Sequence, residues 1–154
     1  MHMRQTSTRL ARPEDIPVLV LFERELAREA FPHDPIEQLD YHEDKLRKAM
    51  VREPEGMVVI VDTQTEEILA WLWLTTKTTL ATGEQYGVMR SVYVRPSARG
   101  RGLGALLGDY ALRHFDATDI SRIVAKVHSS SEAARQLLEK IGFESVHITY
   151  ERRR

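Results

Sequence analysis

The chain has 154 residues, a length that suits one domain with one substantial hydrophobic core. Lysine and arginine number 22 against 23 aspartate and glutamate, and this balance argues against a dedicated nucleic-acid-binding protein. There is no cysteine, which excludes disulfides, thiolate nucleophiles and cysteine metal ligands, and no apolar run is as long as a membrane span. We therefore expect a cytoplasmic protein without a nucleic-acid partner, a membrane partner or a metal.

The pattern of apolar and polar residues predicts alternating strands and helices along the whole chain. Apolar residues three or four apart indicate helices, and short runs of β-branched or alternating residues indicate strands. In chain order we expect a strand over 6–11, helices over 13–30 and 39–50, strands over 57–62, 68–79 and 86–94, a helix over 103–115, a strand over 122–128, a helix over 131–142 and a strand over 146–151. No repeat or low-complexity linker interrupts this order, so the chain predicts one α/β domain over residues 4–154.

A glycine- and arginine-rich turn follows the predicted strand that ends at Val94. It reads Arg99-Gly100-Arg101-Gly102-Leu103-Gly104 and opens directly onto an amphipathic helix. The N–H groups at the start of a helix have no partner inside it, so they can bind an anion, and the helix dipole favours the same ligand. The glycines leave room for a phosphate, and the arginines add positive charge. This turn therefore predicts a pyrophosphate site.

Spacing separates this turn from two other phosphate-binding loops. A P-loop ends in Gly-Lys-Ser or Gly-Lys-Thr, whereas the helix here begins Gly102-Leu103-Gly104-Ala105. The dinucleotide-binding fingerprint needs a third glycine or alanine at the position of Leu107. Neither loop matches the chain.

Two motifs resemble those of the GNAT acetyltransferase superfamily. Arg99-x-x-Gly102-x-Gly104, after Val94-x-Pro96, is similar to its acetyl-coenzyme A loop. The stretch from Ser131 to Phe143, with Ala134 and Leu137-Leu138-Glu139-Lys140, resembles its later helix motif. The resemblance covers essentially the whole chain. It implies an α/β (α+β) fold with a mixed, mostly antiparallel sheet of about six to seven strands, four helices, and strands four and five splayed apart.

The resemblance also implies acetyl-coenzyme A as the co-substrate. Its pantetheine arm would lie in the wedge between the splayed strands and pair with backbone groups there, as an added strand does. Its diphosphate would lie on the glycine-rich turn. The residues that the resemblance assigns to the cofactor are Val92, Tyr93, Val94, Arg99, Gly100, Arg101, Gly102, Leu103, Gly104, Ser131 and Ala134.

The catalytic groups are less well defined. Many family members have a glutamate base on the strand before the loop, where this chain has Val88 and Arg90, and a tyrosine acid in the later motif, where it has Leu138. Two substitutes are Glu84, at the start of the same strand, and His128, because an imidazole titrates near neutral pH and can relay a proton. Both also suit ordinary turn or packing positions. Direct attack by a neutral amine, helped by positioning alone, is the remaining alternative.

The acceptor is indicated only by the region between the first two predicted helices. His33 and Asp34 break these helices, and the family uses this region for substrate contact. Residues 13–44 carry ten acidic side chains and two arginines, which would attract a cationic amine unless they are simply solvated helix faces. The sequence thus predicts an N-acetyltransferase for a primary amine of a small molecule or peptide, which could form a homodimer. The alternative is a non-catalytic acyl-coenzyme A sensor.

Overall fold

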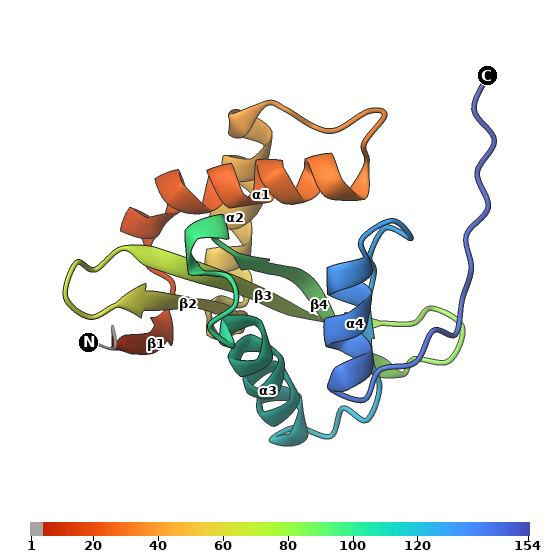
Figure 1. Ribbon diagram of the computed structural model, residues 1–154. Helices are drawn as coiled ribbons and strands as arrows, with labels where there is room; N and C mark the ends of the chain where they lie inside the picture. The colour runs from red at the N-terminus through yellow and green to blue at the C-terminus, as the bar shows by residue number, and fades with distance from the viewer. Residues whose placement is uncertain (1–4) are drawn as a thin grey trace.

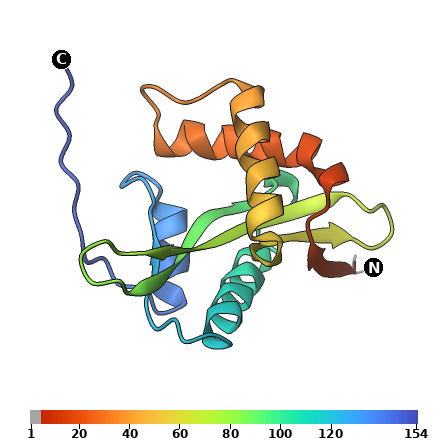
Figure 2. The same ribbon diagram turned by 180° about the vertical axis from the view of Figure 1, so that it is seen from behind.

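One five-stranded sheet, in the order β1-β2-β3-β4-β5, separates two layers of helices (Figure 1). The computed structural model describes residues 5–154. Its strands are β1 (Thr6–Leu10), β2 (Met57–Asp62), β3 (Ile68–Thr78), β4 (Gln85–Val94) and β5 (Ile123–Ala125). Its helices are α1 (Ile16–Ala30), α2 (Leu39–Arg52), α3 (Leu103–Asp116) and α4 (Glu132–Lys140). Figure 2 shows α1 and α2 on one side of the sheet and α3 and α4 on the other.

The sheet is mixed, as predicted. Strands β1 to β4 pair antiparallel with their neighbours, and β5 pairs parallel to β4 over three residues, Gly87–Met89 against Ile123–Ala125. The α/β fold with four helices is confirmed, but the expected count of six to seven strands is wrong. Strand β5 is shorter than predicted, and the segment 146–151 lies outside the sheet as extended chain. Both differences lie at the β5 edge of the sheet, where no further strand is present to pair with.

Each face of the sheet has its own hydrophobic core. On the face of α1 and α2, Phe22 stacks on Tyr93 at 4.5 Å between ring centroids, and Trp71 is fully buried. On the opposite face, Leu107 and Phe115 of α3 pack against β3 and β4. Because β4 contributes to both cores, its position is fixed from two sides. That matters for function, since β4 leads into the glycine-rich turn.

An ion pair joins β1 to the first turn before α1. Arg9 donates two hydrogen bonds to the Asp15 carboxylate, at 2.7 and 3.0 Å, and the Arg12 backbone N–H donates a third at 2.8 Å. Burial opposes the charged form of Asp15, but these donors outweigh it and hold the pKa of Asp15 below its usual range. The pair therefore stabilises the fold only while Asp15 is ionised.

We expect Asp15→Asn to lower the free energy of unfolding at neutral pH by about 1–3 kcal/mol, because it removes charged hydrogen bonds. A carboxyl whose folded pKa is lowered contributes stability above its unfolded pKa, about 4, and loses it as the pH falls through the folded pKa. The difference between variant and wild type should thus shrink below about pH 4 in urea titrations. A difference that is constant with pH would contradict this account.

Candidate active site

Strand β4 has an open edge beyond its short pairing with β5. Pairing with β5 ends at Met89, and from Arg90 to Val94 only β3 borders the strand; we call this stretch the open edge. The Arg95 N–H donates to the Leu69 carbonyl of the β3 side at 2.8 Å. By alternation, the backbone groups of Val92 and Val94 face away from β3. Among these groups the Val94 carbonyl accepts a hydrogen bond from Arg99 Nε at 3.1 Å, and the others can pair with an extended ligand, as the splayed strands predict.

A β-bulge lies at the start of the open edge. Trp73 of β3 pairs with Ser91 and Leu74 pairs with Met89, so Arg90 is an extra residue in β4. The Arg90 guanidinium carbon lies 4.2 Å from the centroid of the Trp73 ring, on the α1 and α2 face of the sheet. Bulges redirect side chains near active sites. Here the redirected group is a cation, at one of the two positions where the resemblance implies a base.

The glycine-rich turn presents unpaired N–H groups at the start of α3. Gly102, with φ of 78°, is the N-cap of α3, and the first helical bond runs from the Leu106 N–H to its carbonyl at 3.1 Å. In residues 5–154 no acceptor pairs with the N–H groups of Leu103, Gly104 and Ala105. A side chain at Gly102 would have no atom within 4 Å, so the turn faces open space. This is the geometry of an anion site at a helix N-terminus.

Two glycines of α3 also allow α4 to approach. A Cβ at Gly104 would lie 3.3 Å from Leu137, and one at Gly108 would lie 2.8 Å from Ile141. Sequence reasoning gave Gly104 a role in the phosphate site and Gly108 none. The structure adds a packing reason for both, which only the position of α4 could reveal.

Of the other residues assigned to the cofactor, Tyr93 directs its side chain toward α1 and not toward the unpaired side of β4. Its ring stacks on Phe22 of α1, and burial raises the pKa of Tyr93, so the hydroxyl stays protonated at neutral pH. The Arg99 side chain instead reaches the open edge, where its Nε donates to the Val94 carbonyl at 3.1 Å. Gly100 and Arg101 are exposed in the turn. Partly exposed Ser131 and Ala134 lie one helical turn apart at the start of α4.

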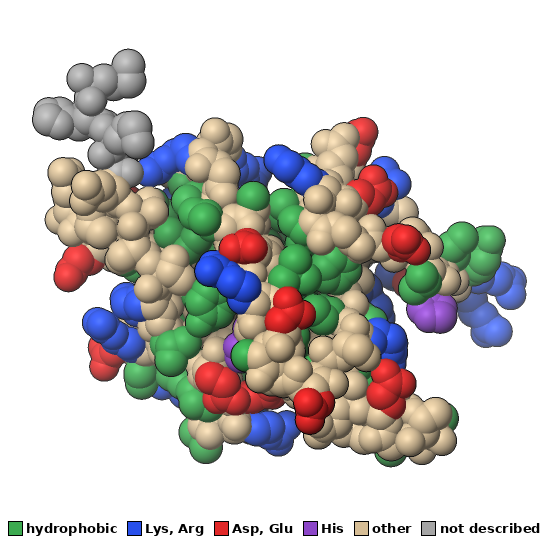
Figure 3. All heavy atoms as spheres, turned by 90° about the horizontal axis from the view of Figure 1, so that it is seen from below, with side chains coloured by type: hydrophobic (Ala, Val, Ile, Leu, Met, Phe, Trp, Pro, Cys, Tyr) green, Lys and Arg blue, Asp and Glu red, His purple; other side chains and the backbone are tan. Residues whose placement is uncertain are grey.

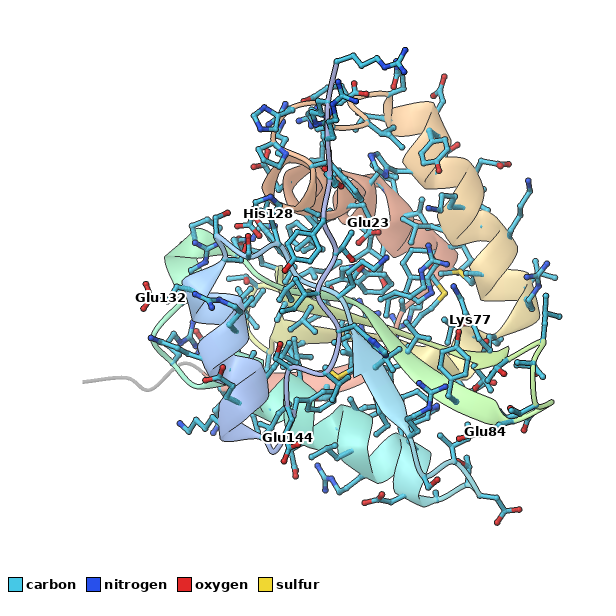
Figure 4. All side chains as sticks on the ribbon, turned by 90° about the vertical axis from the view of Figure 1, so that its right-hand side faces the viewer. Glu23, Lys77, Glu84, His128, Glu132 and Glu144 are labelled. Carbon is cyan, nitrogen blue, oxygen red and sulfur yellow. The ribbon has the colours of Figure 1, made fainter. Side chains whose placement is uncertain are left out.

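The two candidate catalytic residues lie apart. Glu84 precedes β4 and lies 3.7 Å from Arg122 in an ion pair. Eight residues of extended strand separate it from Val92, about 26 Å at 3.3 Å per residue. Figure 4 shows Glu84 at the far end of the sheet from His128. The structure therefore does not bring these two residues to one site.

His128 follows the end of β5, on the same side of the β4–β5 pairing as the open edge. It is three residues beyond Ala125, the last paired residue of β5, just as Val92 is three residues beyond Met89 in the parallel strand. The Ser130 N–H donates to His128 Nδ1 at 3.2 Å, and the Ser130 hydroxyl is 2.7 Å from the same atom. Because Nδ1 accepts from the Ser130 N–H, a neutral His128 carries its proton on Nε2. His128 can thus present an N–H donor.

The predicted acceptor region is the connection between α1 and α2. His33 and Asp34 are both exposed there, and the Asp34 N–H donates to the Phe31 carbonyl at 3.1 Å in a turn. Two acidic side chains of the surrounding region share one arginine. Arg28 pairs with Glu25 and Glu37 at 2.6 and 2.8 Å. One positive charge against two carboxylates leaves the region net negative, so these ion pairs do not remove its attraction for a cationic amine.

One carboxylate near β3 was not identified from the sequence. Glu23 of α1 accepts a hydrogen bond from Trp71 Nε1 at 2.9 Å, and Figure 4 draws both Glu23 and His128 above the sheet. Its neighbour Phe22 belongs to the apolar stripe of α1, but no sequence signal identifies a carboxylate that contacts a buried indole. In the part of the chain that the structure describes, no cluster of histidine and carboxylate side chains could hold a metal ion. No helix of residues 5–154 is long and apolar enough to cross a membrane.

Comparisons with known proteins agree on one family. Residues 20–143 match the acetyltransferase (GNAT) family model. A mycothiol acetyltransferase of Mycobacteroides abscessus is 35% identical over 94 residues, which are 59% of this chain and 30% of that protein. One from Streptomyces scabiei is 35% identical over 86 residues, 56% of this chain and 25% of that protein. The chain spans less than a third of the length of these two relatives.

Solved structures share the fold across almost the whole chain. A possible acetyltransferase from Clostridium difficile 630 has a TM-score of 0.76 at 20% identity, covering 96% of this chain and 97% of that one. A predicted acetyltransferase with acetyl-CoA from Clostridium acetobutylicum has a TM-score of 0.75 at 19% identity, covering 97% and 96%. A transcriptional regulator from Bacillus halodurans C-125 has a TM-score of 0.72 at 18% identity, covering 97% and 99%.

Proposed function

The chain belongs to the GNAT acetyltransferase family, and from this membership we propose that it transfers an acetyl group from acetyl-coenzyme A to a primary amine of a small molecule or peptide. One observation carries the proposal: the open edge of β4 runs directly into a turn of free N–H groups at the start of α3. Such a surface offers hydrogen bonds to an amide-containing arm and an anion site to a diphosphate.

In this proposal the chain holds the cofactor through backbone groups. Val92 and Val94 pair with the pantetheine arm, and the N–H groups of Leu103, Gly104 and Ala105 bind the diphosphate. Arg99 and Arg101 add charge to the anion site; Arg99 would exchange its hydrogen bond with Val94 for one to the ligand. Ser131 and Ala134 border the arm from α4. When bound, acetyl-coenzyme A supplies the activated acetyl group.

The chain then needs to favour a neutral amine and to stabilise the leaving sulfur. Arg90 places a positive charge beside the open edge, and a nearby cation disfavours the ammonium form of an acceptor amine. His128 Nε2–H donates a hydrogen bond to the charge that develops on the leaving sulfur. The nitrogen–carbon bond forms as the carbon–sulfur bond breaks, and the surplus proton of the amine passes through water to the sulfur. No proton transfer is assigned to Glu84.

We expect His128→Ala to lower kcat about 100-fold with little change in the KM for acetyl-coenzyme A, because removing one such donor costs about that factor. His114→Ala, on α3, is the matched control and should keep kcat near wild type. The loss should shrink with an acetyl donor whose thiol is more acidic, since that leaving group needs less stabilisation. An equal loss with both donors would assign His128 a structural role only.

For the acceptor we propose a chemical class, a primary amine of a small molecule. The relatives named mycothiol acetyltransferase support a small-molecule amine, and His33 and Asp34 are the residues that we propose contact it. A screen of amines for acetyl-coenzyme A-dependent release of coenzyme A tests this directly. Turnover of at least one primary amine is expected, in a protein that we expect to act in the cytoplasm.

A second candidate function is a non-catalytic acyl-coenzyme A sensor. It is favoured by Arg90 and Leu138, which replace the usual base and acid, and by the shared fold with a protein named a transcriptional regulator. Cofactor binding without turnover of any amine, together with cofactor-dependent binding of another protein, would support the sensor. Amine acetylation would exclude it.

A further inference from the structure

Two opposite charges on the α1 and α2 face of the sheet have no counter-ion. Glu23 accepts a hydrogen bond from Trp71 Nε1, and the Arg90 guanidinium carbon lies 4.2 Å from the centroid of the Trp73 ring. In the part of the chain that the structure describes, neither charged group pairs with an opposite charge. The outer surface differs, since Figure 3 shows basic side chains beside acidic ones on the face seen from below. Glu23 and Arg90 are therefore available to a charged ligand.

The two charges are held on neighbouring indoles. Trp71 and Trp73 belong to the same core on one face of β3, and their ring centroids are 6.2 Å apart. These tryptophans are 0% and 4% exposed, so a ligand meets the charged groups and not the indole faces. Glu23 and Arg90 thus lie over adjacent points of the sheet, one charge coming from α1 and the other from β4.

Solvent reaches the sheet-facing side of α1 at Glu23. Ile16, Val20, Glu23 and Ala27 follow one another at helical spacing, so they lie on one side of α1. Ile16 and Val20 are buried, whereas Glu23 and Ala27 are half-buried. The second half of α1 therefore does not seal the sheet from water, and a small ligand can reach the Glu23 carboxylate.

Arg90 and Ser91 lie at the end of the open edge where the acetyl group would be. The glycine-rich turn follows Val94, so an arm that starts at the turn runs back along β4 past Val94 and Val92 and brings its thioester beside Arg90 and Ser91. Ser91 pairs with Trp73 and is 6% exposed, yet its hydroxyl has no hydrogen-bond partner among the described residues. A polar group in so buried a residue is normally satisfied, so this hydroxyl indicates a ligand group.

We propose that the acceptor is a free amino acid, bound through both of its charged groups. The Arg90 guanidinium and the Ser91 hydroxyl donate hydrogen bonds to its carboxylate, and Glu23 accepts one from its amine. Pairing with Arg90 also offsets the acceptor's own carboxylate, which would otherwise favour the unreactive ammonium form. Since this assignment names the acceptor of the same transfer, it rests on the proposed function.

Paired acceptors test the carboxylate contact. Each standard amino acid is compared with its amide, which has nearly the same size but no negative charge. We expect kcat/KM of the best amino acid, measured by release of coenzyme A, to exceed that of its amide by about tenfold or more. The amide has the more easily deprotonated amine, so solution chemistry alone would favour the opposite order. Amides acetylated as well as the amino acids would overturn the assignment and leave the proposed function intact.

Arg90→Leu tests the guanidinium through this ratio and not through the rate. The variant should acetylate amino acid and amide equally well, whereas Arg90→Lys, which keeps the charge, should retain part of the preference. Arg122→Leu is the matched control, because Arg122 also stacks on a ring of β4, 4.5 Å from the centroid of Tyr86, but pairs with Glu84. This control should keep the full preference. A full preference in Arg90→Leu would contradict the carboxylate contact.

Glu23→Gln tests the amine contact. Glutamine keeps an acceptor for the Trp71 N–H and removes the charge, so we expect KM for the amino acid to rise about tenfold and KM for acetyl-coenzyme A to stay constant. Glu25→Gln removes a carboxylate of the same helix that already pairs with Arg28 at 2.6 Å, and it should leave both KM values unchanged. Equal KM values for the amino acid in these two variants would exclude Glu23 from the site.

Thermal unfolding of the wild-type chain with coenzyme A gives a readout that needs no turnover. We expect at least one amino acid to raise Tm and its amide to leave Tm unchanged. This result without acetylation of any amine would refute the proposed function and support the amino acid site. Acetylation of amines without a preference for the carboxylate would refute the amino acid site alone, and absence of both turnover and Tm shift would refute both.

Discussion

Gly102→Glu should abolish acetyl-coenzyme A binding, with a loss of affinity of at least about 100-fold, which is about 2.7 kcal/mol. Gly102 has φ of 78°, and its N–H belongs to the turn at the start of α3 that we assign to the diphosphate. A glutamate there brings a carboxylate into an anion site and obstructs the approach of the ligand. Titration of the folded variant with acetyl-coenzyme A measures the effect.

Gly83→Glu is the matched control for backbone strain and for charge. Gly83, in the connection between β3 and β4, has φ of 73° and, like Gly102, no atom within 4 Å of an added Cβ. An L-residue in this conformation costs about 1–2 kcal/mol, so both variants should lose similar stability. Only Gly102→Glu should lose the ligand. Equal affinities of the two variants for acetyl-coenzyme A would show that the diphosphate does not bind at this turn.

The junction of β4 and β5 should be sensitive to changes in packing. Phe115 of α3 is 1% exposed, and a Cβ at Gly87 would lie 2.7 Å from its ring. We expect Phe115→Ala to lower the free energy of unfolding by about 3–5 kcal/mol through loss of a buried ring. We expect Gly87→Val to lower it by about 1–3 kcal/mol through overpacking. Urea denaturation of both variants gives the two values.

The double variant Gly87→Val/Phe115→Ala tests the contact itself. Because the valine occupies space that the missing ring leaves, the double variant should be more stable than the sum of the two single losses predicts. Strict additivity would show that the two residues do not share this space. Since Gly87–Met89 is the only stretch of β4 that pairs with β5, loss of this packing should also weaken cofactor binding.

The parts of the fold that the sequence predicted well carry local signals. The strand before Val94, the turn and α3 follow one another without a gap, and each has its own pattern: alternation, positive-φ glycines and an apolar stripe. The helix motif that ends at Gly142 is similar, with Gly142 at φ of 99°. In both segments the residues that determine the structure are close together in the sequence, so the sequence alone can predict it.

The features that the sequence missed depend on distant segments. The bulge at Arg90 arises from the register between β3 and β4, and no local pattern contains it. The role of Gly108 depends on Ile141 of the segment after α4. Segment 146–151 has a good strand pattern, but a strand forms only beside a partner, and the edge strand β5 offers only three residues. The distance between Glu84 and Val92 follows from the ten-residue length of β4, which no local pattern gives.

Calorimetric titration of the wild-type chain with acetyl-coenzyme A, with ADP as the comparison ligand, tests the central claim most directly. Both ligands carry a diphosphate, but only acetyl-coenzyme A has an arm that can pair with Val92 and Val94 at the open edge. We predict micromolar binding of acetyl-coenzyme A that is at least about tenfold tighter than that of ADP. Absence of binding, or equal binding of ADP, would reduce the turn to a general anion site and contradict the assignment of the open edge to the cofactor.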